Sequence, residues 1–208
     1  MPRSVYAISK RDQEELSLSI GRAYGIPVVA LRYFNIYGPR QSLSNPYTGV
    51  AAIFSSRLRN GHSPVIFEDG RQSRDFIHVS DIIRANLLVM KRREADGETF
   101  NVGTGVATSV GRVAELLAES LEIPIPSTIV GKFRAGDIRH CVADVSKIRR
   151  RLGFEATVRF EDGLSDLVRW VQEGAEREKY ESEFKAVSEK RCASCHDGSN
   201  PHLVNLIG

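Results

Sequence analysis

Apolar positions along the chain recur with two different periods, which predict helices and strands in alternation. A helical period marks the segments 6–24, 50–60, 80–90, 110–121, 145–152 and 162–171. Short apolar runs of strand length lie between them, at 26–33, 64–67, 74–79 and 99–102. The run 26–33 is apolar almost throughout, as expected for a strand buried on both faces of a parallel sheet. This alternation predicts an α/β fold.

Residues typical of helix ends support these bounds. Gly25, Gly61 and Gly153 follow predicted helices, where glycine readily forms the C-terminal cap. Ser80 is expected to cap the N-terminus of the helix that follows it. The segment 35–49 is rich in turn-forming residues and is predicted to be a loop.

Composition narrows the class of protein. The chain has 208 residues, of which 41% are hydrophobic and 26% charged, as in an ordinary globular protein. It carries 29 basic and 26 acidic residues, which is too even a mixture for a nucleic-acid-binding face. No apolar run is long enough to span a membrane, and the N-terminus does not resemble a secretory signal, so we expect a cytoplasmic protein. Composition turns strongly charged near residue 172, which divides the chain into 1–171 and 172–208.

Tyr6 and Lys10 are four residues apart on the first predicted helix, so their side chains share one face. An ammonium beside a phenol favours the phenolate, which would make Tyr6 a usable general base. The same spacing also arises by chance on solvated helix faces, so the pair alone identifies no site.

Four motifs give this pair a context. In chain order they are Tyr-Ala-Ile-Ser-Lys at 6–10, Leu-Arg-Tyr-Phe-Asn-Ile-Tyr-Gly-Pro-Arg at 31–40, Ser-Arg-Asp-Phe-Ile-His-Val at 73–79 and Phe-Asn-Val-Gly at 100–103. The set resembles the extended short-chain dehydrogenase/reductase family, and within it the NAD-dependent nucleotide-sugar epimerases and dehydratases. The resemblance extends from residue 6 to about residue 171.

The resemblance implies an incomplete Rossmann-like fold, namely the C-terminal half of a doubly wound parallel sheet together with a small α/β substrate-binding domain. It also implies NAD as the cofactor. Tyr6 matches the catalytic tyrosine that takes a proton from a sugar hydroxyl, and Lys10 matches the lysine that binds the cofactor ribose. Tyr33 and Phe34 match residues that pack against the nicotinamide.

Two arginines, Arg74 and Arg134, match residues that contact the diphosphate of a nucleotide sugar. A planar guanidinium suits phosphate oxygens, and two of them would offset much of the charge of a diphosphate. The alternative is a structural ion pair, of Arg74 with Asp75 or of Arg134 with Asp137.

Four further residues match positions around the sugar and the nucleoside. Asn35 matches an amide that reaches the substrate, and Asp137 matches a carboxylate near the nucleoside. Val65 and Phe67 lie in the short strand that lines the nucleobase in the family. The alternative for Asn35 is an amide that stabilises a turn.

The turn Gly103-Thr104-Gly105 follows a predicted strand and precedes a helix, as a dinucleotide-binding turn would. Thr108 stands where the third glycine of that motif belongs, so an ordinary strand-to-helix turn is the better interpretation. A Rossmann fold carries its pyrophosphate-binding turn on the first half, and the chain begins shortly before Tyr6. We therefore expect this chain alone to bind NAD poorly and to have no measurable epimerase activity.

Two other titratable side chains are expected to be structural. His78 lies within a predicted strand and is interpreted as a packed core residue, and Cys141 as an inert thiol. The tail raises another question, because Cys192, Cys195 and His196 have the spacing of a c-type haem attachment site. No methionine follows that could act as a second axial ligand.

The tail therefore has three interpretations: a covalent haem site, a zinc site completed by His202, or a segment that binds nothing. The last is favoured, so no metal site is predicted. The resemblance implies an NAD-dependent 4-epimerase of UDP- or dTDP-hexoses that acts through a transient 4-keto sugar. Members of the family commonly dimerise, so the resemblance also implies a homodimer. The alternatives are a 4,6-dehydratase or decarboxylase of the same family, a non-catalytic binding module, and a haem electron-transfer protein.

Overall fold

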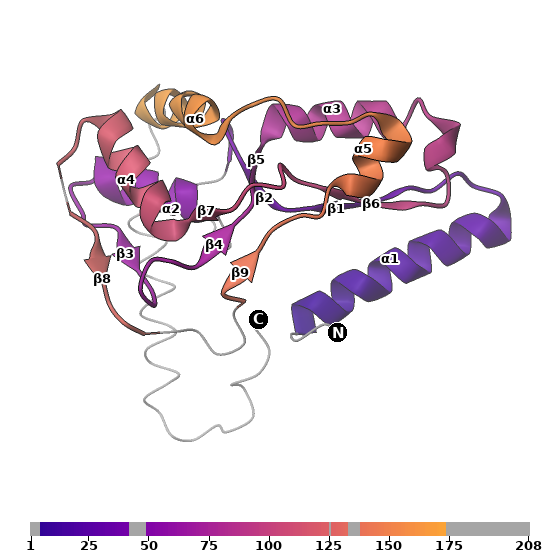
Figure 1. The fold of residues 1–208 in the computed structure, drawn as a ribbon, viewed down its shortest axis with the longest axis horizontal. Coiled ribbons are helices and arrows are strands. Elements are labelled where there is room, and N and C mark those ends of the chain that lie inside the picture. The colour runs from indigo at the N-terminus through magenta and orange to yellow at the C-terminus, as the bar shows by residue number, and fades with distance from the viewer. Residues whose placement is uncertain (1–4, 42–48, 125, 133–137, 174–208) are drawn as a thin grey trace, which may run out of the picture.

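The computed structural model describes residues 5–41, 49–124, 126–132 and 138–173 (Figure 1). In chain order its elements are α1 (Val5–Tyr24), β1 (Ala30–Tyr33), β2 (Asn35–Tyr37), α2 (Val50–Arg59), β3 (Val65–Ile66), β4 (Ser73–Arg74), β5 (Phe76–His78), α3 (Val79–Val89), the 3₁₀ helix η1 (Arg93–Ala95), β6 (Thr99–Val102), β7 (Thr108–Ser109), α4 (Val110–Leu121), β8 (Thr128–Ile129), β9 (His140–Cys141), α5 (Ser146–Leu152) and α6 (Phe160–Glu173). The strands pair in parallel except for β4 with β7, and the predicted α/β class is confirmed.

β1 and β6 form a parallel pair in which Ala30 lies opposite Thr99 and Tyr33 opposite Val102. In Figure 1, α3 and α5 lie on one side of this pair and α1 lies on the other. Phe100 and Val102 are completely buried in the cluster that also contains side chains of α3 and α5. The alternation of buried and half-buried residues along β6 follows from the two-residue period of a strand.

The chain changes its strand partner just after β1. The backbone N–H of Phe34 still donates to the carbonyl of Val102 in β6, at 3.2 Å. The next N–H, that of Asn35, donates instead to the carbonyl of Asp75, at 2.9 Å, and β2 continues as the parallel partner of β5. The segment 35–49, predicted to be a loop, therefore begins with a strand.

Two hydrophobic clusters meet at β5. Phe76 packs in the cluster formed largely by α2, α4 and α6, with side chains such as Leu117 and Leu164. Its neighbour Ile77 packs in the cluster around β6, with Phe100. Because successive side chains of a strand point to opposite faces, β5 is buried on both sides and joins the two cores.

The helices with the clearest apolar period are placed as predicted. α4 buries Val113 and Leu117 completely, and α6 buries Leu164 and Leu167. Ser109 caps α4, because its Oγ accepts a hydrogen bond from the backbone N–H of Arg112 at 3.1 Å.

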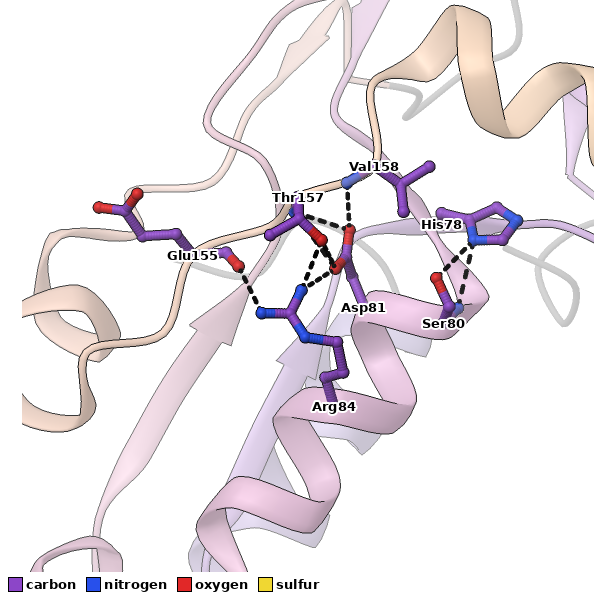
Figure 2. A network of polar contacts seen from close by, with 7 residues as sticks. All are labelled: His78, Ser80, Asp81, Arg84, Glu155, Thr157 and Val158. Carbon is purple, nitrogen blue, oxygen red and sulfur yellow. Dashed lines mark hydrogen bonds and ion pairs between the residues drawn. The ribbon is translucent and has the colours of Figure 1, made fainter.

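A buried carboxylate joins α3 to the segment that precedes α6 (Figure 2). Asp81, in the first turn of α3, is completely buried and accepts hydrogen bonds from the backbone N–H groups of Thr157 and Val158, at 3.1 and 3.0 Å. It also forms an ion pair with Arg84, whose guanidinium reaches the hydroxyl of Thr157 at 2.7 Å. Two parts of the chain, α3 and residues 157–158, thus meet at one side chain.

Three expectations about individual elements are wrong. The strand predicted over 26–33 is confined to β1, and its last two residues are exposed instead of buried on both faces. The strand predicted over 74–79 is divided at Asp75 into β4 and β5. The N-cap of α3 is His78, not Ser80, since Nδ1 of His78 accepts from the backbone N–H of Ser80.

α1 has the predicted bounds but little cover. Among the described residues of this helix, only Gly21 is buried, while Leu16 and Ile20 are 62% and 45% exposed. None of the helices in the described ranges is both long and apolar enough to cross a bilayer.

Candidate functional site

Arg74 lies in β4, the middle strand of the sheet β7-β4-β9. Its Nη1 donates to the carbonyl of Ser73 at 2.9 Å and to the carbonyl of Arg139 at 3.0 Å, just before β9. Asp75, the ion-pair partner considered from the sequence, directs its carboxylate to other groups. The half-buried guanidinium is therefore held against β9 by these carbonyl oxygens.

The residue that holds Arg74 is itself held by two carboxylates. The guanidinium of Arg139 donates to Glu68 and to Asp69, each at 2.7 Å. This contact with Arg139 also holds the pKa of Asp69 below its usual value. The backbone N–H of Glu68 donates to the carbonyl of Lys132 at 2.8 Å. The connection between β3 and β4 thus binds Lys132 and Arg139, which lie before and after residues 133–137.

Asp75 is a site residue that the sequence reasoning missed. It is completely buried, and its carboxylate accepts four hydrogen bonds. Oδ1 accepts from the backbone N–H and the hydroxyl of Thr104, at 2.8 and 2.6 Å. Oδ2 accepts from the backbone N–H groups of Gly105 and Ala143, at 2.8 and 3.1 Å. The signal in the sequence is an acidic residue directly before the apolar pair Phe76-Ile77, where a buried charge must find donors.

Asp75 brings two predicted substrate residues together. Its carbonyl accepts from the N–H of Asn35 at 2.9 Å, and Arg74 precedes it in the chain. Asn35 begins β2 and is half-buried, so it belongs to a strand and not to the turn considered as its alternative. The turn Gly103-Thr104-Gly105 leads from β6 to the short strand β7, which precedes α4, so the predicted strand-to-helix connection contains a further strand. The N–H groups of Thr104 and Gly105 bind the Asp75 carboxylate.

The predicted nucleobase residues lie on and just after β3. Val65 is half-buried and pairs in parallel with Thr128 of β8. Phe67 follows the strand and its side chain is 51% exposed. The carbonyl of Phe67 accepts from the buried side chain of Gln72 at 2.8 Å, which fixes the connection that leads to β4.

Tyr6 and Lys10 form a second group, on α1. The ammonium of Lys10 lies 5.6 Å from the centre of the Tyr6 ring, which confirms that the two side chains share a face. Both are exposed, and the Lys10 ammonium also donates to Gln13 at 3.1 Å. The helix is attached to β1 by a two-bond contact of Arg32 with Glu14, at 2.7 and 2.6 Å, which lowers the pKa of Glu14.

Tyr33 and Phe34 lie where β1 ends. Phe34 is half-buried, whereas the Tyr33 side chain is 43% exposed. The hydroxyl of Tyr33 donates to the side chain of Asn86 on α3 at 2.8 Å. Tyr33 also lines an open groove of about 420 Å³ with Leu31 and Met90. Its ring is therefore accessible from the α3 side of the sheet.

The remaining predicted residues lie outside the described part of the chain. These are Arg134 and Asp137, predicted to bind the diphosphate and the nucleoside, and the tail residues Cys192, Cys195, His196 and His202. His78 is buried, as predicted, with its ring against Tyr37 at 5.4 Å between centroids. Cys141 is a half-buried free thiol in β9.

Comparison with known proteins gives this arrangement a family. Residues 1–103 match the sequence model of the NAD dependent epimerase/dehydratase family. The dTDP-L-rhamnose 4-epimerase of Burkholderia thailandensis is 35% identical over 176 residues, which cover 85% of this chain and 48% of the relative. This chain thus spans about half the length of the curated relatives that it matches.

Solved structures agree with this assignment. The UDP-glucose 4-epimerase of Thermotoga maritima, solved with UDP-glucose, superposes with a TM-score of 0.76 at 38% identity, over 81% of this chain and 53% of the other. The UDP-N-acetylglucosamine 4-epimerase of Methanobrevibacter ruminantium, solved with UDP-N-acetylmuramic acid, gives a TM-score of 0.77 at 38% identity, over 83% and 55%. None of these similarities supports a haem site in the tail. The chain belongs to the NAD-dependent epimerase/dehydratase family, within the extended short-chain dehydrogenases/reductases.

Proposed function

We propose that this chain binds a UDP- or dTDP-hexose and takes part in its NAD-dependent 4-epimerisation. The observation that carries the proposal is the position of Arg74, whose guanidinium is fixed by the carbonyls of Ser73 and Arg139 close to Asn35. A guanidinium held in this way binds phosphate oxygens through several donors at once. The similarity to two 4-epimerases solved with UDP-sugars supports the same conclusion.

Each of the other predicted residues would contact a different part of the nucleotide sugar. Arg74 would bind the diphosphate, and Asn35, held beside it through Asp75, would donate or accept at the sugar. Phe67 offers an exposed ring after β3, against which a nucleobase can stack, with Val65 behind it in the strand.

The residues predicted to contact NAD would bind only the nicotinamide and its ribose. Tyr6 and Lys10 place a phenol and an ammonium on one exposed helix face, as a ribose and a sugar hydroxyl require. Bound NAD supplies the acceptor and donor of hydride at the sugar carbon. Tyr6 would take the hydroxyl proton as the 4-keto sugar forms and return it afterwards, with Lys10 stabilising the phenolate. The chain contains no Gly-x-Gly-x-x-Gly sequence for the pyrophosphate.

Calorimetric titration with UDP and dTDP tests the diphosphate site. We expect Arg74→Ala to weaken UDP binding by about tenfold to a hundredfold, because a charge-assisted contact is lost. Arg92→Ala is the control, since Arg92 is an exposed arginine before η1 and removes the same charge elsewhere. Equal affinities of the wild type, Arg74→Ala and Arg92→Ala for UDP would contradict the proposal.

The family also contains dehydratases, so the reaction class needs a test of its own. Incubation with UDP-glucose and NAD gives UDP-galactose if the activity is 4-epimerisation, and a 4-keto-6-deoxy product if it is dehydration. We expect neither product from this chain alone, because the sequence has no pyrophosphate-binding glycine motif. Turnover by the purified chain would overturn that expectation and reveal the reaction.

A further inference from the structure

We propose that Asp75 is a positioning residue that sets the spacing between Asn35 and Arg74, and so between the sugar-binding and diphosphate-binding parts of the site. The inference rests on the proposed function for its ligand. It assigns to Asp75 a role that depends only on contacts among the described residues. Asp75 itself does not touch the ligand in this proposal.

Asp75 lies where two strand pairs meet. It lies at the point where the chain leaves the β1–β6 pair and enters the β2–β5 pair. At that point the β1–β6 pairing has ended and β5 has not yet begun, so the backbone groups of Asp75 need other partners. In parallel α/β sheets such a point, at the carboxyl ends of strands, is where ligands bind.

The carboxylate of Asp75 accepts from four donors. Three are backbone N–H groups, of Thr104, Gly105 and Ala143, and the fourth is the Thr104 hydroxyl. All four donors are neutral, and they come from the turn after β6 and from the segment after β9. One buried side chain therefore fixes two backbone segments that are not hydrogen-bonded to each other in either strand pair.

The backbone of Asp75 binds the candidate site residues. Its carbonyl accepts from the N–H of Asn35 at 2.9 Å, and its N–H donates to the carbonyl of Cys141 in β9 at 3.0 Å. Arg74 is its direct neighbour and leans on the carbonyl of Arg139, two residues before Cys141. A movement of Asp75 would therefore displace Asn35 and Arg74 together.

The carboxylate of Asp75 is tightly packed against Gly103. A Cβ built on Gly103 would lie 2.6 Å from Oδ2 of Asp75 and 2.6 Å from the Cβ of Ala143. Glycine is thus required at Gly103 by the close approach of Asp75, because any side chain would push the carboxylate away from its donors.

The experiment compares Asp75→Asn with Asp81→Asn in the full chain. Both replace a completely buried carboxylate that accepts backbone N–H groups, so both remove a comparable structural contact. Only Asp75 adjoins the candidate site. Thr104→Val is a milder variant that removes one of the four hydrogen bonds to the carboxylate, together with the bond that the hydroxyl accepts from the N–H of Val106. It keeps the test possible if Asp75→Asn does not fold.

Two measurements are made at a temperature at which circular dichroism shows that each variant is folded. The affinity for UDP is expected to fall about tenfold in Asp75→Asn and about twofold to threefold in Thr104→Val, and to stay unchanged in Asp81→Asn. The ¹H–¹⁵N resonances of the Asn35 amide and the Arg74 guanidinium are expected to shift, without ligand, in the two site variants only.

Each outcome has a separate meaning. If the wild type does not bind UDP, the proposed function fails, and the resonances alone decide the role of Asp75. Unchanged Asn35 and Arg74 resonances in the Asp75 and Thr104 variants would overturn the inference. So would an equal loss of UDP affinity in Asp75→Asn and Asp81→Asn, which would mean that the loss reflects stability alone.

Discussion

Two buried aspartates differ in the partners that satisfy their charge. Asp75 accepts only from neutral donors, whereas Asp81 combines backbone N–H groups with the guanidinium of Arg84 (Figure 2). A carboxylate that is fully desolvated costs several kcal/mol unless it is paired or hydrogen-bonded, in the range of about 2 to 7 kcal/mol for polar groups in general. We therefore expect the loss of an acceptor at either position to lower the free energy of unfolding.

Asp81→Asn is expected to lower the free energy of unfolding by about 2 to 4 kcal/mol, because an amide can accept at only one of its two polar atoms. Urea titration followed by circular dichroism measures the change. Arg84→Ala is the control, since it removes only the half-exposed partner and leaves the N–H groups of Thr157 and Val158 on the carboxylate. A larger loss in Arg84→Ala than in Asp81→Asn would contradict this assignment.

His78 predicts a dependence of stability on pH. Burial lowers its pKa, against the opposing effects of Asp166 and Asp81, so the folded protein keeps the ring neutral. The unfolded chain takes up this proton near about pH 6.5. Below that pH the unfolded state binds more protons, and the free energy of unfolding falls as the pH falls towards the pKa of the folded state.

The measurement is urea unfolding at several values between about pH 5 and 8, in the range where histidine titrates. We expect the loss of stability on the acidic side to be smaller in His78→Asn, which keeps an acceptor for the N-cap contact with Ser80. The same slope in both proteins would assign the acid sensitivity to other groups.

The sequence reveals residues whose role is carried by a local motif. Tyr6 and Lys10 are recognisable because four residues along a helix fix their relation, and the 5.6 Å contact agrees. Asp75 is not recognisable in this way, because its donors are Thr104, Gly105 and Ala143, distant in the chain. Only the tertiary fold determines which backbone groups surround a buried charge.

At the scale of elements, α1 is attached to the sheet at two points. Gly21 approaches Val28 so closely that an added Cβ would lie 2.6 Å from its methyl group and 2.9 Å from the carbonyl of Ile26. Glu14 forms the two-bond ion pair with Arg32 of β1. Both contacts lie away from Tyr6, in the middle of the helix and near its C-terminal end.

Gly21→Ala is expected to lower the free energy of unfolding by about 1 to 3 kcal/mol, because the methyl group overpacks against backbone. An ordinary glycine inside a helix would give the opposite sign, a gain of about 0.5 to 1 kcal/mol with alanine. Ser17→Ala, at an exposed position of the same helix, is the control and is expected to be neutral or slightly stabilising. Thermal unfolding of the two variants compares them; a gain in Gly21→Ala would exclude the close contact.

The elements themselves were predicted to different extents. α4 and α6 follow from their apolar period and bury Leu117 and Leu164, as the pattern requires. The break between β4 and β5 does not follow, because at Asp75 the chain changes its partner strand from β9 to β2, which only the tertiary fold determines. The length of β1 also could not be predicted, since an apolar run does not state how many of its residues find a partner strand.

At the scale of the molecule, apolar surface is exposed on both sides of the β1–β6 pair. On α3, Ile83, Leu87 and Met90 are 54%, 51% and 80% exposed, and α1 exposes Leu16 and Ile20. Contiguous apolar patches of this kind are typical of surfaces that are covered in an assembly or by further chain. The homodimer expected from the sequence stays a prediction.

We expect the purified chain to associate and to bind the dye ANS, and we expect the double variant Leu16→Glu/Ile20→Glu to do both less. Charges at these exposed positions oppose burial without disturbing the core. Light scattering and dye fluorescence measure the effect, with Ser17→Glu as the control for added charge on the same helix. Monomeric wild type without dye binding would show that these faces are inert.

The pairing of β1 with β6 also constrains the order of folding. Residues 30–33 cannot find their partners until residues 99–102 have been synthesised, and parallel pairs between distant segments form slowly. The turn that binds Asp75 follows directly after β6. During translation, the candidate site can therefore take shape only after the ribosome has released residues up to about Gly105, and Ala143 completes it still later.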